Sequence, residues 1–262
     1  MIMVEPVGEA HIDDVIQALM AEAAADPDVI GLVLLGSRAI GTETAESDYD
    51  LIFMVTDAAA ARYEQTKSEP KRGVNLPRPI DTVDIWNDTP SGLRVENVIS
   101  WMLPTFAEAK VIYDRTGEAA RVIDALRQMP AEMARKEIED GYGTYLNKLY
   151  RSLKCWRRGN ELGGRMEAAE TADALVRALF ALEGHWRPYS SRLVYHLDRL
   201  AGQGWQPGEL RESLLDLIGT GNPQRQQCLA RKVVPLFRER GYGHVYDEWN
   251  GRIDKILGWD FS

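Results

Sequence analysis

Apolar residues follow two different periods along the chain, and the change between them divides it into two halves. In the first half, short apolar runs rich in β-branched residues alternate with polar stretches, as expected of strands. The predicted strands cover residues 29–35, 48–55, 80–86 and 107–113. Beyond residue 118, apolar residues recur at the three- and four-residue spacing of amphipathic helices. The pattern therefore predicts strands first and helices afterwards.

Helices are also expected around the strands. Ile12, Val15, Ile16 and Leu19 recur at helical spacing before Asp26-Pro27, and they predict a helix at residues 10–24. A short helix is expected at 58–65, and the stretch 92–112 is a mixture of helix and loop broken at Pro104. Further helices are expected at 118–128, 132–158, 165–184, 189–201, 208–218, 222–239 and 244–257, because Gly and Pro residues fall between them.

These elements predict an α+β fold with two domains. Residues 1–120 would form a domain around a mixed sheet, and residues 121–262 would form an all-helical domain. No internal repeat or low-complexity segment interrupts either half. The helical half is long enough to wall a cleft for a substrate.

Polar residues with recognisable chemistry gather between the first two predicted strands. Gly36 and Ser37 follow the first strand, and a Gly at a sharp turn lets backbone N–H groups approach phosphate oxygens. Asp48 and Asp50 lie at the start of the second strand, on the same side and about 7 Å apart. Two such carboxylates can share hard cations such as Mg²⁺. The stretch therefore predicts a site for a nucleoside triphosphate and metal ions.

A third carboxylate is expected from the strand at 80–86, where Asp81 and Asp84 point to opposite faces. Val83 and Ile85 would make a packed face and leave Asp84 on the other side. We select Asp84 as the third metal ligand on this ground. Asp81, at the start of the strand, is the alternative, and its simpler interpretation is a solvated end residue.

Composition narrows the classes of function. The chain of 262 residues has a net charge of −9, which argues against broad binding to nucleic acid and suits a cationic substrate. Cys155 and Cys228 are too few for a disulfide scaffold and lack the spacing of a zinc site. No apolar run is long enough to cross a bilayer, and the N-terminus lacks the pattern of a signal peptide. We expect a cytoplasmic protein that has no membrane partner.

The two motifs together resemble a known family. Gly-Ser-Arg-Ala-x-Gly at residues 36–41 precedes Ser-Asp-x-Asp-Leu at 47–51, and apolar strands flank both. The sequence resembles the nucleotidyltransferase superfamily that includes DNA polymerase β-like enzymes. It is most similar to the small-molecule branch, with aminoglycoside and lincosamide nucleotidyltransferases. Looser similarities extend to residues 107–117 and 178–193.

The resemblance implies roles for individual residues. It places Gly36 and Ser37 at the triphosphate, and Asp48 and Asp50 on two metal ions, which in this family are Mg²⁺. Asp84 would complete the metal and catalytic set. In some members the third carboxylate is also the general base, whereas in others a Glu of the helical domain takes the proton from the acceptor.

Several further residues have two open interpretations. Arg38 follows the phosphate turn and is expected near the nucleotide, with an outward salt bridge as the alternative. Lys148 is expected to reach the triphosphate, while Glu167 and Glu170, one helical turn apart, are candidates for the substrate side. For these three the simpler interpretation is a solvated helix face. The larger aromatic residues are expected mainly in the core, with stacking on a base or substrate ring as the alternative: Trp86, Trp101, Tyr145, Trp156, Phe180 and Trp186.

Two functions of different classes follow. The first is a Mg²⁺-dependent enzyme that moves AMP or another NMP from ATP or another triphosphate to a hydroxyl of a small molecule, such as an aminoglycoside-type antibiotic. The second is a nucleotidyltransferase of the antitoxin type that modifies a partner protein. The length of the chain and its own helical domain favour the first. A template-directed polymerase is disfavoured, because the chain lacks a basic stripe for nucleic acid.

Overall fold

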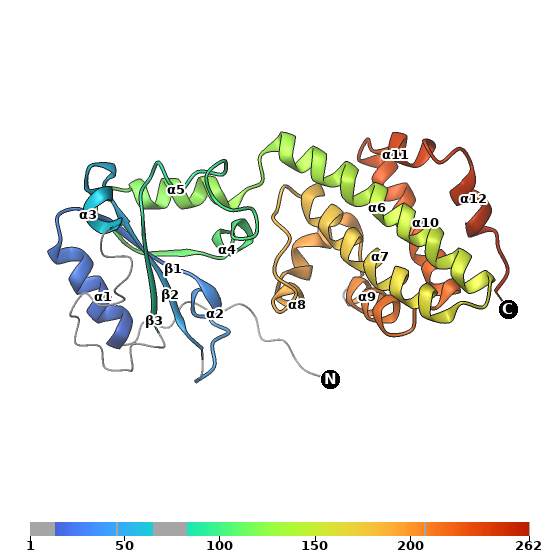
Figure 1. Ribbon diagram of the computed structural model, residues 1–262, viewed down its shortest axis with the longest axis horizontal. Helices are drawn as coiled ribbons and strands as arrows, with labels where there is room; N and C mark the ends of the chain where they lie inside the picture. Colours follow the sequence, from blue (N-terminus) through green and yellow to red (C-terminus); the bar gives the residue numbers. More distant parts are fainter. Residues whose placement is uncertain (1–13, 46, 65–82, 207, 262) are drawn as a thin grey trace. The chain divides into compact units, whose positions relative to one another are not determined.

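The structure is a computed structural model that describes residues 14–45, 47–64, 83–206 and 208–261. The chain divides into two compact units, and the division falls between Gln128 and Met129. The first unit contains a mixed β-sheet, and among the described residues the elements of the second are helices joined by loops (Figure 1). This arrangement confirms the α+β prediction. Within the described ranges, no helix combines the length and the apolar composition needed to cross a membrane.

Within the described residues, four strands form the sheet of the first unit in the order β3-β2-β1-β4. The strands are β1 (Val29–Leu34), β2 (Tyr49–Val55), β3 (Val83–Asp88) and β4 (Lys110–Asp114). β1 pairs antiparallel with both β2 and β4, whereas β2 and β3 run parallel. All four predicted strands are therefore present; residues 80–82 of the third prediction lie outside the described residues, and the other ends differ by a few residues. β3 is the outermost of the described strands on the side of β2.

The two faces of the sheet have different surroundings. One face packs on α1 (Asp14–Ala25), and alternate residues of β2 such as Tyr49, Leu51 and Phe53 join its core. On the other face α5 (Glu118–Arg127) lies against β1 and β4, and Gly31 of β1 faces Ala119. A Cβ on Gly31 would lie 2.4 Å from the Cβ of Ala119, so this Gly permits the close approach of α5.

Short helices connect the strands. α2 (Gly36–Ile40) follows β1, and 3₁₀-helix η1 (Asp57–Ala59) with α3 (Ala60–Glu64) follows β2. α4 (Leu103–Phe106) includes Pro104, where the sequence was interpreted as a break. That interpretation was wrong in detail because Pro lies in the first turn, where its missing N–H needs no partner.

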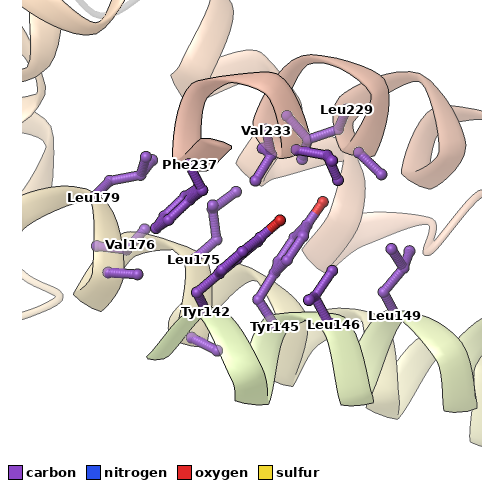
Figure 2. Packing of buried hydrophobic residues seen from close by; sticks show 14 of the residues in the cluster. Tyr142, Tyr145, Leu146, Leu149, Leu175, Val176, Leu179, Leu229, Val233 and Phe237 are labelled. Atoms are coloured by element: carbon purple, nitrogen blue, oxygen red, sulfur yellow. The ribbon is translucent and has the colours of Figure 1, made fainter. Parts of the chain in front are cut away.

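The second unit begins with an antiparallel helical hairpin, α6 (Ala131–Arg157) and α7 (Glu161–Leu182). α10 (Pro223–Glu239) packs on it, and Figure 2 shows Tyr142 and Tyr145 of α6 projecting toward α10. The ring of Tyr142 stacks on Phe237 at 4.1 Å between centroids. Within the described residues, neither tyrosine hydroxyl has a hydrogen-bond partner.

Two predicted helices of this unit are interrupted. The range 189–201 contains a short α8 (Leu193–His196) followed by 3₁₀-helix η3 (Leu197–Gln203), rather than one helix. The range 244–257 contains α11 (Gly243–Asp247) and α12 (Arg252–Leu257), because Asn250 and Gly251 adopt positive φ and end the helical path. α9 (Glu209–Gly219) agrees with its predicted range within one residue.

Candidate functional site

The carboxylates predicted on neighbouring strands are register partners. β2 and β3 run parallel, and Asp50 lies directly opposite Asp84 in that ladder. Neighbours at the same position of adjacent strands point to the same face, so both side chains lie on the face opposite the α1 core. Asp84 is exposed and Asp50 is partly buried. The sheet therefore presents two adjacent carboxylates on an accessible face.

The alternation predicted for the third strand is observed. Val83 is buried in the core beside α1 and Ile85 packs against that core, whereas Asp84 is exposed on the other side. Asp81, the alternative for the third carboxylate, lies outside the described residues. The role of Asp84 as a metal ligand stays a prediction.

The Gly-Ser turn lies directly against Asp50. Gly36 has a φ of 74°, and a Cβ built on it would lie 2.4 Å from Oδ2 of Asp50. The N–H of Leu35 donates to the carbonyl of Asp50 at 2.8 Å, which ties the end of β1 to the start of β2. Only Gly satisfies both the backbone conformation and the contact. The turn and the carboxylate, separated by a loop in sequence, are thus one structural unit.

Arg38 holds the loop that leads to Asp48. It is 4% exposed, and it donates from Nε to the carbonyl of Asp48 at 3.2 Å and from NH2 to the carbonyl of Ser47 at 2.8 Å. Its guanidinium lies 3.7 Å from the ring centroid of Tyr49. The outward salt bridge considered for Arg38 is therefore wrong, because the side chain folds inward under this loop. A contact between Arg38 and a nucleotide stays a prediction.

Asp48 precedes β2 and is exposed. It lies one residue before the strand and two residues before Asp50. Ser37, at the second position of α2, is partly buried. The structure thus brings Gly36, Asp48, Asp50 and Asp84 to one end of the β1–β2–β3 part of the sheet.

The donor chemistry of this set fits Mg²⁺, which prefers carboxylate oxygens and retains several waters. The in-register pair supplies two such groups from adjacent strands. Across residues 14–45, 47–64, 83–206 and 208–261, however, no three His, Cys, Asp or Glu side chains surround one point as a complete ligand cluster. To complete a set of three carboxylates, Asp48 would therefore have to move toward Asp50 and Asp84.

The other predicted site residues form a separate cluster in the second unit. Lys148 of α6 lies 2.6 Å from Glu170 and 3.2 Å from Glu167 of α7, and Arg151 lies 2.7 Å from Glu167. The Glu167 side chain is only 13% exposed. A hydrogen bond with Glu170 raises the pKa of Lys148 above its ordinary value, and Glu167 adds to this effect. The simpler interpretation, a solvated helix face, does not describe Glu167.

Lys148 also borders a shallow surface hollow of about 430 Å³ on α6, lined by Glu139, Asp140, Gly143, Thr144 and Asn147. The lining of the hollow includes two carboxylates, those of Glu139 and Asp140. Whether Lys148 meets a triphosphate, and whether Glu167 and Glu170 meet a substrate, stay predictions.

The aromatic residues divide between core and surface. Tyr145, Phe180 and Trp186 are buried in the helical unit, as expected. Trp86 and Trp101 of the first unit are 43% and 62% exposed, so their assignment to the core was wrong. Trp86 lies on β3, where it shares the face of Asp84. Alternation along the strand was the available signal, because it places Trp86 on the side of Asp84 and away from Val83 and Ile85.

Comparisons with known proteins add little to this geometry. A family model described as a domain of unknown function, DUF4037, matches residues 97–192. That range is less than half of the chain, and it begins after Gly36, Asp50 and Asp84. No curated protein matches the chain.

One solved structure is similar over most of the chain. It is described as a nucleotidyltransferase-like protein from Exiguobacterium sibiricum 255-15, at 16% sequence identity. The similarity covers 92% of this chain and 88% of that chain, with a TM-score of 0.38. Both the identity and the TM-score are too low to transfer a function or a site.

Proposed function

We propose that the protein transfers a nucleotidyl group from a nucleoside triphosphate to a hydroxyl of a small molecule. The observation that supports this most is the in-register pair Asp50 and Asp84 with Gly36 packed on the Asp50 carboxylate. Phosphoryl and nucleotidyl transfer need charge neutralisation on the phosphates and fixed positions for the reacting groups. The pair and the turn are the parts of the described chain suited to those tasks.

Asp48, Asp50 and Asp84 would hold Mg²⁺, which neutralises phosphate charge and lowers the barrier to displacement when bound. Gly36 lets the backbone of the turn approach the phosphate oxygens, and Ser37 offers a hydroxyl donor. Arg38 keeps the loop of Ser47 and Asp48 in place through their carbonyls. These residues bind and orient the triphosphate beside the carboxylates.

In the reaction, the oxygen of the acceptor hydroxyl forms a bond to the α-phosphorus. The bond from that phosphorus to the oxygen bridging the α- and β-phosphates breaks, and pyrophosphate leaves. The hydroxyl proton passes to a base, for which we assign Asp84, the more exposed member of the pair. ATP is the first triphosphate to test, and the net charge of −9 favours a cationic acceptor.

The test is pyrophosphate release from ATP, GTP, CTP and UTP with Mg²⁺ and a panel of aminoglycosides and other hydroxyl compounds. We expect release with at least one pair of nucleotide and acceptor, and its loss with excess chelator. Asp50→Asn should lower the rate at least about 10³-fold, because it removes a charge that the transition state needs. Asp124→Asn, on the exposed side of α5, is the matched control and should keep full activity.

Absence of release with every combination would contradict the proposal, as would an Asp50→Asn variant with the activity of the unsubstituted protein. Transfer of labelled AMP to a co-purified protein, with no small acceptor used, would instead favour a protein-modifying activity. Circular dichroism of each variant shows whether the fold is retained.

A further inference from the structure

Trp86 is a large aromatic side chain on the open face of β3. It is 43% exposed, and it lies two residues after Asp84 on β3. Residues two apart in a strand point to the same side, about 7 Å from each other. Its register partner on β2 is Ile52, which is buried. The indole therefore lies on the carboxylate face, anchored on an apolar neighbour and open to solvent.

The order of the strands places Gly36, Asp50 and Asp84 in a row across the sheet. Gly36 follows β1, Asp50 belongs to β2, and Asp84 with Trp86 belongs to β3. Because the sheet order is β3-β2-β1, Asp50 lies between the turn and the β3 residues. The contact of Gly36 with the Asp50 carboxylate fixes the near end of the row. Asp84 lies at its far end, and Trp86 lies beside Asp84, two residues further along β3.

In-line displacement assigns the two ends to different reactants. The attacking oxygen and the leaving oxygen lie on opposite sides of the phosphorus. If the turn at Gly36 and Ser37 holds the pyrophosphate side, the acceptor must approach from the side of β3. We propose that Trp86 is the floor of the acceptor subsite and stacks against a ring of the acceptor. This inference rests on the proposed nucleotidyl transfer and names the acceptor side of the same site.

The chemistry of the subsite selects a class of acceptor. An indole face binds the C–H face of a saturated ring, a flat aromatic ring, or a cation above the ring. The acceptor that fits is a ring compound with hydroxyl groups and at least one ammonium group. The nucleobase is the rival occupant of the indole, and the test separates the two.

The experiment measures indole fluorescence without nucleotide or metal, using kanamycin as a cationic ring probe and methyl glucoside as a neutral one. The chain has 7 tryptophans, so the signal of Trp86 is taken as the difference between the unsubstituted protein and Trp86→Phe. Trp101→Phe, which replaces another exposed indole of the same unit, is the matched control. We expect kanamycin to quench the Trp86 difference signal more strongly than methyl glucoside does, and to leave the Trp101 difference signal unchanged.

Kinetics give the second measurement. With any acceptor that supports pyrophosphate release, Trp86→Ala should raise the acceptor KM at least fivefold and leave the nucleotide KM within twofold. Trp86→Phe should recover most of the loss, since it keeps an aromatic face. Calorimetry of MgATP binding should give equal affinities for the unsubstituted protein and Trp86→Ala.

Three results would overturn the inference. The first is a nucleotide affinity that falls at least fivefold in Trp86→Ala, which would assign the indole to the base. The second is an acceptor KM that does not change, and the third is the absence of quenching by both probes. Quenching by kanamycin without any pyrophosphate release would support ring binding at Trp86 and contradict the proposed function. Pyrophosphate release with an unchanged acceptor KM in Trp86→Ala would support the proposed function and contradict the inference about Trp86.

Discussion

The carboxylates of the two units differ in exposure to solvent and in ion pairing. In the sheet unit, Asp48 and Asp84 are exposed, and among the described residues neither side chain is within ion-pair distance of a Lys or Arg. In the helical unit, Glu167 lies between Lys148 and Arg151 and is largely removed from solvent. The first arrangement leaves negative charge available to a cation from outside, whereas the second neutralises it internally. Similar residue types are thus open to solvent in one unit and paired with cations in the other.

The largest expected effect concerns the packing of the helical unit. Phe237 is fully buried and stacks on Tyr142, so Phe237→Ala should lower the free energy of unfolding by about 3–5 kcal/mol. Leu215→Ala, at an exposed position of the same unit, should change it by less than about 0.5 kcal/mol. Urea titration followed by circular dichroism measures both.

The same variant also tests whether nucleotide binding is independent of the packing of the helical unit. Where Phe237→Ala is still folded, its affinity for MgATP should equal that of the unsubstituted protein, because the proposed nucleotide site lies in the sheet unit. A large loss of nucleotide affinity in folded Phe237→Ala would contradict the placement of the nucleotide site in the sheet unit.

The next effect concerns the turn at Gly36. Gly36→Ala should lower the transfer rate at least about 100-fold, because its Cβ would displace the Asp50 carboxylate. Gly117→Ala is the matched control, since Gly117 also has positive φ but has no atom within 4 Å of an added Cβ. Both variants should lose about 1 kcal/mol of stability from backbone strain. Equal activity of the two variants would show that strain alone, and not the contact with Asp50, matters.

A smaller effect is expected from the buried tyrosines at alkaline pH. Burial raises the pKa of the Tyr142 and Tyr145 phenols in the folded protein. Above the ordinary phenol pKa of about 10, the unfolded chain loses these protons while the folded chain keeps them. The free energy of unfolding should therefore fall with rising pH, by about 1.4 kcal/mol per unit for each group.

Tyr145→Phe should remove the contribution of one phenol to the change of the free energy of unfolding with pH. At pH 7 the substitution should leave stability unchanged or raise it by up to about 1 kcal/mol, because within the described residues the hydroxyl has no hydrogen-bond partner. Urea titrations at pH 7, 9 and 10.5 measure both quantities. A loss above 1 kcal/mol at pH 7 would show that a buried water satisfies the hydroxyl.

The smallest effect concerns Lys148. Because two glutamates already engage its ammonium group, Lys148→Met should weaken MgATP binding by less than about fivefold and cost about 1 kcal/mol or less in stability. Lys232→Met is the matched control, because Lys232 is also paired, with Glu209. A loss of nucleotide affinity above tenfold in Lys148→Met but not in Lys232→Met would contradict the assignment of nucleotide binding to the sheet unit alone.

The local parts of the fold followed from the sequence. Apolar runs located the strands, and alternation along β3 separated Asp84 from Val83 and Ile85. Relations between distant residues did not follow. The sequence gives no register, so the pairing of Asp50 with Asp84 and the contact of Gly36 with Asp50 required the three-dimensional structure.

Other differences have equally specific causes. An outward salt bridge was one of two interpretations of Arg38, but the carbonyls of Ser47 and Asp48 and the ring of Tyr49 draw its side chain inward. The helix expected at 244–257 ends early because Asn250 takes a positive φ, which Asn tolerates better than most residues. Such effects depend on partners and conformations that periodicity does not report.

The parallel pairing of β2 with β3 has a consequence for the order of folding. A parallel neighbour cannot form from a tight hairpin, so Asp50 and Asp84 meet only after a long crossover has closed. Gly31 of β1 likewise pairs with Asp114, far along the chain, whereas α6 and α7 join through only residues 158–160. Contacts between distant residues slow folding. In refolding, the helical hairpin should therefore form first, and the carboxylate pair should be among the last features to assemble.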